Sequence, residues 1–244
     1  MIFGFSHIDC EQSVRTRAMT LSIPDVTPSE FQIQMASFNG CNAYGISCSW
    51  MTLPDDLHLE SGSIDTHGTG EMYHDHFTQR VVFGQRFASP PKICTWLQEF
   101  DYTSDIDSST VANTFTSLFV RADNINEHSF TLHIGSWANR KFRNARAGWF
   151  AYPSEEDGKR VKSGRDRVTS AERTQQKKAP FYGQPFSRTP ATFIAISEID
   201  FAGHSNLRMT STVKALNNQE MEWSFGTWGI SIIDHADITW IALE

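Results

Sequence analysis

The segment QEMEWSFGTWGISIIDHADITWIALE (219–244) decides the fold, because it recurs twice upstream, as SEFQIQMASFNGCNAYGISCSWMTLP (29–54) and HSFTLHIGSWANRKFRNARAGWFAYP (128–153). Each copy has a large apolar residue, an aromatic residue seven positions later and a tryptophan twelve positions beyond that. Agreement at both spacings indicates an internally repeated chain. The three sets are Phe31/Phe38/Trp50, Phe130/Trp137/Trp149 and Met221/Trp228/Trp240.

A second block of sequence precedes each of these segments and ends in aspartate. The blocks are FGFSHID (3–9), TWLQEFD (95–101) and AISEID (195–200). Still further upstream, LESGSID (59–65) matches RVKSGRD (160–166), and the first copy has no counterpart. We therefore predict three copies, at 1–54, 58–153 and 160–244. The first is incomplete at its N-terminal side, either because its first sheet is one strand short or because the sequence starts inside a unit.

The local pattern within the copies is that of β-strands. Phe31, Ile33 and Met35 alternate with polar or small residues, as expected for a strand with one buried face. No stretch of twelve or more residues has convincing helical periodicity. The sequence therefore predicts an all-β protein of small antiparallel sandwiches. Trp50, Trp149 and Trp240 lie inside strand patterns and are expected in the core. Phe38, Trp137 and Trp228 are each followed by a turn and are expected near the surface.

Composition and charge exclude several classes of protein. The net charge of −7 argues against a nucleic-acid partner, whose binding surface is basic. No apolar stretch approaches the roughly 20 residues that span a bilayer, so we expect no membrane insertion. Residues 1–22 lack the pattern of a signal peptide. The four cysteines form no CxxC pair and are expected to be free thiols. These features favour a cytoplasmic or non-classically released protein.

An arginine and a tryptophan in the third copy suggest sugar binding. Arg208 lies in a strand pattern, and Trp228 lies in a turn that would bring its ring near the surface. An aromatic ring can cover the apolar face of a sugar while a guanidinium donates hydrogen bonds to its hydroxyl oxygens. The competing interpretation is that the recurrent aromatic residues belong to the core and that Arg208 forms a surface ion pair.

The order and spacing of these motifs resemble the H-type lectin domain, found in snail agglutinins and at the C-terminus of discoidins. The motifs are SG-x-x-D, F-x-x-x-P, I-x-x-x-D, N-L-R, then T-W before a strand that contains W-I. The resemblance implies six-stranded antiparallel β-sandwiches that assemble as trimers and bind galactose or N-acetylgalactosamine at subunit junctions. Three copies in one chain would then form a single-chain pseudo-trimer, either monomeric or a homo-oligomer, whose partners are glycans or glycoproteins.

The resemblance also carries over a set of candidate binding residues. In the second copy Asn113-Thr114-Phe115 takes the place of N-L-R, with Arg121 nearby, and Asp75 is expected to reach the tryptophan of a neighbouring copy. The expected carbohydrate-binding residues are Arg208, Trp228 and Gly229 in the third copy, Trp137, Asn139 and Asp75 in the second, and Arg15, Phe38 and Asn39 in the first.

Three other functions compete with a lectin. A glycosidase needs two carboxylates that flank a cleft, but Asp9, Asp101 and Asp200 recur in every copy and look structural. Cys94 lies in a predicted buried strand and is a poor nucleophile candidate. The sequence therefore predicts neither an enzyme nor a cofactor.

The second rival is a zinc site, which His74 and His76 could form together with His58 or His67; surface histidines are the simpler interpretation, and no metal is predicted. The third rival is a β-sandwich scaffold that binds other proteins without binding sugar.

Overall fold

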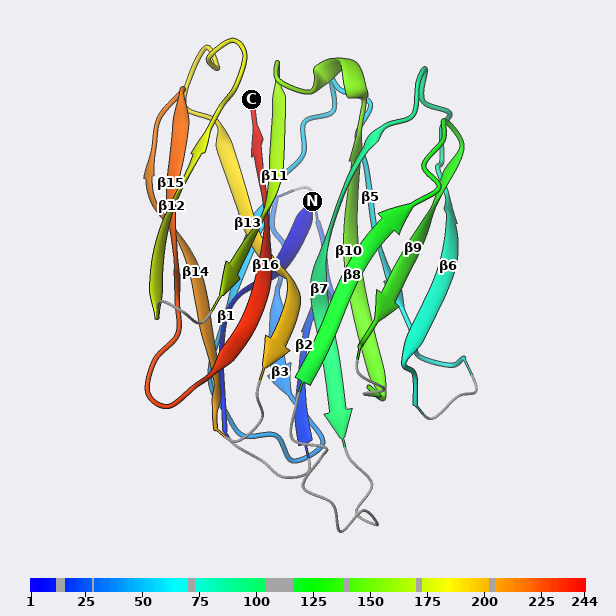
Figure 1. Ribbon diagram of the computed structural model, residues 1–244. Helices are drawn as coiled ribbons and strands as arrows, with labels where there is room; N and C mark the ends of the chain where they lie inside the picture. Colours follow the sequence, from blue (N-terminus) through cyan, green and yellow to red (C-terminus); the bar gives the residue numbers. More distant parts are fainter. Residues whose placement is uncertain are drawn as a thin grey trace.

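The computed structural model describes residues 1–11, 16–27, 29–69, 73–103, 116–137, 141–169, 173–201 and 205–244. Over these residues the chain is built of antiparallel strands and one short 3₁₀ turn, which confirms the all-β prediction (Figure 1). Among them no helix is long and apolar enough to cross a membrane. The elements are β1 (Ile2–Cys10), β2 (Thr16–Ser22), β3 (Gln34–Ser37), β4 (Ala43–Met51), β5 (Glu60–Asp65), β6 (His76–Val82), β7 (Lys92–Thr103), β8 (Thr116–Asp123), β9 (Ser129–Gly135), β10 (Asn144–Tyr152), η2 (Ser154–Glu156), β11 (Val161–Thr169), β12 (Thr174–Pro180), β13 (Ala191–Phe201), β14 (Leu207–Leu216), β15 (Glu220–Gly226) and β16 (Ile233–Leu243).

The strands fall into three groups along the chain: group 1 is β1–β4, group 2 is β5–β10 and group 3 is β11–β16. The recurrent aspartates fix the correspondence, since Asp9, Asp101 and Asp200 lie near the ends of β1, β7 and β13. The four strands of group 1 therefore match the third to sixth strands of the other two groups. We refer to corresponding strands by their place in a full group of six, so that β1, β7 and β13 are third strands.

Each of the three sheets is shared between two groups. Their strand orders are β12-β15-β14-β1-β4, β3-β2-β7-β10-β5 and β11-β16-β13-β8-β9-β6. The third strand of one group pairs with the fourth strand of another, as β1 with β14, β7 with β2 and β13 with β8. These three pairings close a ring, which is the arrangement predicted for a single-chain pseudo-trimer. Since no sheet belongs to one group alone, the boundaries at 1–54, 58–153 and 160–244 stay a prediction.

We call the three places where groups meet junction 1–2, where β2 pairs with β7, junction 2–3, where β8 pairs with β13, and junction 3–1, where β14 pairs with β1. The three third strands also pack against one another at the centre of the ring. They run side by side in the same direction, so that their ends near Asp9, Asp101 and Asp200 face the same end of the molecule (Figure 1).

The centre of the ring is a dense apolar core whose packing differs from group to group. At one level Trp96 of β7 meets Gly4 of β1 and Ala195 of β13, and a Cβ on Gly4 would lie 2.5 Å from the indole and 2.8 Å from the Ala195 methyl. These three residues occupy matching positions, each five residues before a recurrent aspartate. One large and two small side chains fill this space, a solution open to a single chain but not to three identical subunits.

A one-residue bulge interrupts each third strand at the same place. The register of β1 skips Ser6, that of β7 skips Gln98 and that of β13 skips Ser197. A bulge re-aims the residues that follow it. In β7 the residue before the bulge, Leu97, packs in the main core, whereas Glu99 after it contacts polar groups of neighbouring strands. The bulge thus turns the end of each third strand toward a junction.

The core prediction for the recurrent tryptophans is confirmed in two copies and wrong in the first. Trp149 and Trp240 are 7% and 8% exposed, whereas Trp50 is 49% exposed. In β10 and β16 the tryptophan is covered by a glycine of the adjoining first strand, at Gly62 and Gly164. β4 has no such neighbour among the described strands, because it lies at the edge of its sheet.

Candidate functional site

One row of side chains crosses each shared sheet at the junction. It starts with the aromatic residue that follows the fifth strand and continues with one residue each from the fourth, third, sixth and first strands. At junction 3–1 the row is one residue shorter, since no first strand adjoins β4 in the described part of the chain. The rows are Phe38–Thr20–Glu99–Arg146–Asp65 at junction 1–2, Trp137–Phe119–Glu198–Asp237–Arg167 at junction 2–3 and Trp228–Thr210–His7–Ser47 at junction 3–1.

The row at junction 1–2 lines an open pocket of about 440 Å³. This volume lies within the range of small-molecule sites in proteins, roughly 300–1,000 Å³. The pocket combines one aromatic ring with two carboxylates, a guanidinium and an imidazole, so it offers an apolar surface beside both donors and acceptors of hydrogen bonds. Its lining residues are Thr20, Ser22, Phe38, Asp65, His67, Glu99 and Arg146.

Glu99 is held in this pocket by contacts with three other side chains. Its buried carboxylate accepts a hydrogen bond of 2.7 Å from the Thr20 hydroxyl, pairs at short range with His67 Nε2, and lies 3.6 Å from Arg146 Nη2. Arg146 Nε in turn lies 3.7 Å from an oxygen of Asp65. These contacts hold the polar groups in place before a ligand arrives, which lowers the entropic cost of binding.

Phe38 is positioned by the turn that follows β3. Its backbone N–H donates to the carbonyl of Ala18, and its ring packs against the edge of the main core. Asn39 and Gly40 both have positive φ angles, 52° and 76°, which Asn and Gly tolerate better than other residues. The Asn39 amide donates to Asp101 across the junction at 2.7 Å. The Asn-Gly turn and this bond together hold Phe38 at the mouth of the pocket.

At junction 3–1 the structure brings together the residues predicted in the third copy. The Arg208 guanidinium donates to Asp9 at 3.1 Å and passes over Gly229, where a Cβ would lie only 2.3 Å from Nη1. Trp228 is half-buried and stacks on the ring of His7, with centroids 5.3 Å apart. Gly229 also has a positive φ of 67°. Both the turn and the approach of Arg208 therefore require a glycine at this position.

At junction 2–3 the aromatic residue is surrounded by other rings. Trp137 stacks on Phe119 at 5.2 Å and on His235 at 5.4 Å. The Ser117 hydroxyl donates to the backbone carbonyl of Trp137 and accepts from the backbone N–H of Trp137. The indole is thus engaged by the rings of two other side chains of the protein itself.

The remainder of the row at junction 2–3 is an ion-pair network centred on Glu198. This fully buried carboxylate contacts Arg121, Arg165 and Arg167 at 2.6–3.1 Å and His235 at 2.8 Å. Asp237 completes the network by accepting from Arg165 and Arg167. Although burial opposes ionisation of Asp237, the hydrogen bonds and charges of these two arginines outweigh it and lower its pKa below the ordinary value of 3.8.

The strand register shows which residues of the first two copies occupy the position of Arg208. Asp9 pairs with Arg208, whereas the matching partner of Asp101 is Ala18 and that of Asp200 is Ser117. Neither junction therefore has an arginine at this position. Arg15, Asn139 and the segment 113–115 lie outside the described residues. At junction 1–2 a guanidinium is supplied instead by Arg146 of the sixth strand.

The backbone of Asp75 lies beside the aromatic residue of its own copy, and the reach of its side chain to a neighbouring tryptophan stays a prediction. The Asp75 carbonyl accepts from Ser136 of its own group, one residue before Trp137. It stays beside its own aromatic residue because β6 and β9 are adjacent strands of the same group.

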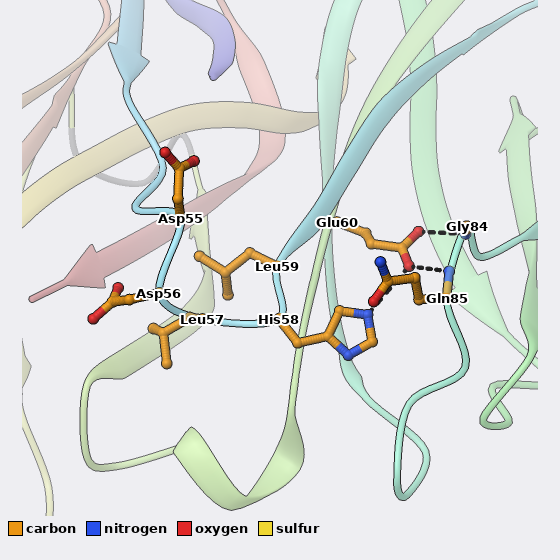
Figure 2. A pocket seen from close by; sticks show the side chains of 8 residues that line it. All are labelled: Asp55, Asp56, Leu57, His58, Leu59, Glu60, Gly84 and Gln85. Atoms are coloured by element: carbon orange, nitrogen blue, oxygen red, sulfur yellow. Dashed lines mark hydrogen bonds and ion pairs between the residues drawn. The ribbon is translucent and has the colours of Figure 1, made fainter.

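A second pocket, of about 490 Å³, follows β4 where the chain passes into group 2 (Figure 2). Its best-placed polar group, Glu60, is occupied, since the carboxylate accepts from the N–H groups of Gly84 and Gln85 at 2.7 and 2.9 Å. The carboxylates of Asp55 and Asp56 point away from Glu60 (Figure 2). The polar groups here tie the 84–85 turn to β5, and none of the described residues that line this pocket is Phe, Tyr or Trp, so we consider junction 1–2, which has Phe38, the better candidate site.

Neither rival chemistry gains support from the described residues. No three His, Cys, Asp or Glu side chains gather there as a metal site would need. The two histidines of the proposed zinc site have different neighbours, since His74 packs on Phe142 and His76 stacks on His133. Burial raises the pKa of the Cys94 thiol to about 11, which makes it a poor nucleophile at neutral pH.

The family model of the H-type lectin domain matches residues 1–52, 78–152 and 176–243. The chain belongs to the H-type lectin domain family. It is therefore a carbohydrate-binding lectin, of a family that is generally non-catalytic. Comparisons of this lectin with curated proteins and with solved structures found no match.

Sequence reasoning found the aromatic residues of all three rows but missed the polar centre of the lectin's junction 1–2. Glu99, Arg146 and His67 carried no motif of their own. One signal was available for Glu99: it stands two residues before a recurrent aspartate, as Glu198 does.

Proposed function

We propose that the lectin binds terminal galactose- or N-acetylgalactosamine-type sugars, and that junction 1–2 is its best-formed site. The observation that carries this proposal is one pocket that joins the ring of Phe38 to Glu99 and Arg146. Galactose presents an uninterrupted C–H face that suits an aromatic ring, while its hydroxyls both donate and accept. In the proposed complex the sugar stacks on Phe38, donates to the carboxylates and accepts from Arg146.

Junction 3–1 is proposed as a second site. Arg208 is held by Asp9 and Gly229, and Trp228 lies two residues along the sheet from that pair, against His7. The guanidinium can donate to sugar hydroxyls, as the family resemblance implies. Junction 2–3 is proposed to be structural, because Trp137 and Glu198 are already engaged by neighbouring side chains.

We further propose that binding involves no catalysis and that the lectin acts as a monomer. A monosaccharide buries little surface, so each site is expected to bind weakly. Two sites in one molecule then raise the overall affinity by effective concentration.

A glycan array followed by calorimetry with N-acetylgalactosamine tests the proposal. Phe38→Ala and Arg146→Met are each expected to weaken binding to the array by about tenfold or more, the loss typical of a central contact. Trp228→Ala and Arg208→Ala are expected to lower avidity further, and Trp137→Ala is expected to change binding only through stability.

Tyr182→Ala is the matched control, since this aromatic side chain is strongly exposed and lies outside the three rows. Absence of binding by the folded parent protein to the galactose-type glycans of the array would exclude the proposed specificity. Unchanged binding by folded Phe38→Ala and Arg146→Met variants would place the sugar elsewhere.

A further inference from the structure

The sandwich of group 1 is open along one side, where the other two sandwiches are covered. In groups 2 and 3, β5 and β11 cover the edges of β10 and β16, and β6 and β12 cover β9 and β15. Among the described residues, β4 and β3 have no strand at the matching edges. We call the side formed by β3 and β4 the open flank.

Core positions are exposed along this flank in both sheets. Trp50 of β4 is 49% exposed, although its counterparts Trp149 and Trp240 are nearly buried. Met35 of β3 is 47% exposed, whereas the residues in the matching register, Ile134 and Phe225, are 0% and 1% exposed. The exposure therefore comes from an absent neighbour and not from polar sequence.

The covered edges of β10 and β16 show which residue of an added strand fits beside the recurrent tryptophan. Gly62 pairs with Trp149 and Gly164 pairs with Trp240, and a Cβ on either glycine would come within 2.9 Å of the indole. Only glycine can therefore face the ring at this distance. In both first strands a serine precedes the glycine, and in β11 Asp166 accepts from the Trp240 indole N–H at 3.0 Å.

We infer that the open flank is a docking site for an extended peptide that adds to β4 as an antiparallel strand, with a Ser-Gly pair placing its glycine over Trp50. Strand addition supplies main-chain hydrogen bonds to the free edge of β4, and the glycine supplies specificity. The interaction buries Trp50 as β5 buries Trp149. The peptide would also adjoin Ser47, the last residue of the row at junction 3–1, but its binding is measured without sugar, so the inference can fail independently of the proposed function.

The test uses the full chain and a fluorescent synthetic peptide, LESGSIDT, with the sequence of residues 59–66. Fluorescence anisotropy is expected to show saturable binding. A peptide carrying Gly62→Val is expected to bind at least about tenfold more weakly, because its side chain meets the Trp50 ring. The chain variant Trp50→Ala is expected to lose a similar factor, whereas Tyr182→Ala, which alters another exposed aromatic side chain, retains binding.

Three outcomes would overturn the inference. The first is absence of binding by the LESGSIDT peptide to the folded chain. The second is equal binding of the glycine and valine peptides, which would mean that the tryptophan is not covered. The third is a chain dimer in sedimentation that Trp50→Ala converts to monomer, which would make a second copy the occupant.

Discussion

At the scale of single residues, the centre of the ring shows how one chain departs from threefold symmetry. Gly4, Trp96 and Ala195 occupy matching positions, and the indole fills space that two small residues leave free. The indole N–H also donates to the carbonyl of Phe3, so the tryptophan is held by a hydrogen bond as well as by packing. Each of the three positions thus accepts only the residue size found there.

Gly4→Ala is expected to lower the free energy of unfolding by about 1–3 kcal/mol, the usual cost of overpacking a core. The added methyl group would overlap both Trp96 and Ala195. Urea unfolding followed by tryptophan fluorescence measures the change. Gly84→Ala is the control, because a Cβ there meets only the Glu60 carboxylate at 3.7 Å or more. Equal stabilities of the two variants would contradict the packing described for the ring centre.

At the scale of strands, the junction rows show that the same geometry tolerates reversed charges. Arg146 of β10 lies beside Asp65 of β5, while the matching positions of β16 and β11 carry Asp237 and Arg167. Cross-strand pairs of opposite charge stabilise adjacent strands whichever strand bears the negative charge. The first and sixth strands are therefore joined by an ion pair at junctions 1–2 and 2–3.

The lowered pKa of Asp237 predicts that the contribution of this strand pair to the stability of the protein depends on pH. A carboxyl whose pKa is lower in the folded than in the unfolded state stabilises the protein above its ordinary pKa, and loses that effect as the pH falls through the folded value. Asp237→Asn is therefore expected to cost about 1–3 kcal/mol at pH 7, with the difference shrinking below a pH of about 4.

Unfolding by urea between pH 3 and pH 7 measures this difference, with Asp234→Asn as the control on an exposed side chain of the same strand. A destabilisation by Asp237→Asn that is constant across this range would contradict the ionic role of Asp237.

The sequence predicted the strands and the aromatic residues of the site better than its polar residues. Spacing alone placed Phe38, Trp137 and Trp228 after their strands, because turns and alternation are local properties. The position of Arg208 is taken by Ala18 in group 1, where Arg15 was expected, because register between distant strands decides it and no local pattern reports that register. Glu99 was missed because a bulge at Gln98 changes the side to which it points.

At the scale of the whole molecule, the pairing of strands from different groups makes the three groups depend on one another. Every sheet takes strands from two groups, so unfolding one group would leave open edges on both others. The chain is thus expected to unfold as one cooperative unit, although its sequence repeats.

Calorimetry is expected to show a single transition with equal calorimetric and van't Hoff enthalpies, and sedimentation is expected to show a monomer of 27.6 kDa. The excised segment 58–153 is expected not to form a stable monomer, since β7 loses its partner β2 and β8 loses β13. Separate melting transitions, or a stable monomeric segment 58–153, would show that the groups fold independently.

The common direction of the three third strands has a consequence for how the lectin meets a cell. Because β1, β7 and β13 run in the same direction, their ends near Asp9, Asp101 and Asp200 lie at the same end of the molecule (Figure 1). If the proposed sugar sites beside these ends are occupied together, a single molecule is expected to make several contacts on one glycan-coated membrane. Binding to one cell surface without agglutination of cells is then the behaviour expected of the monomer.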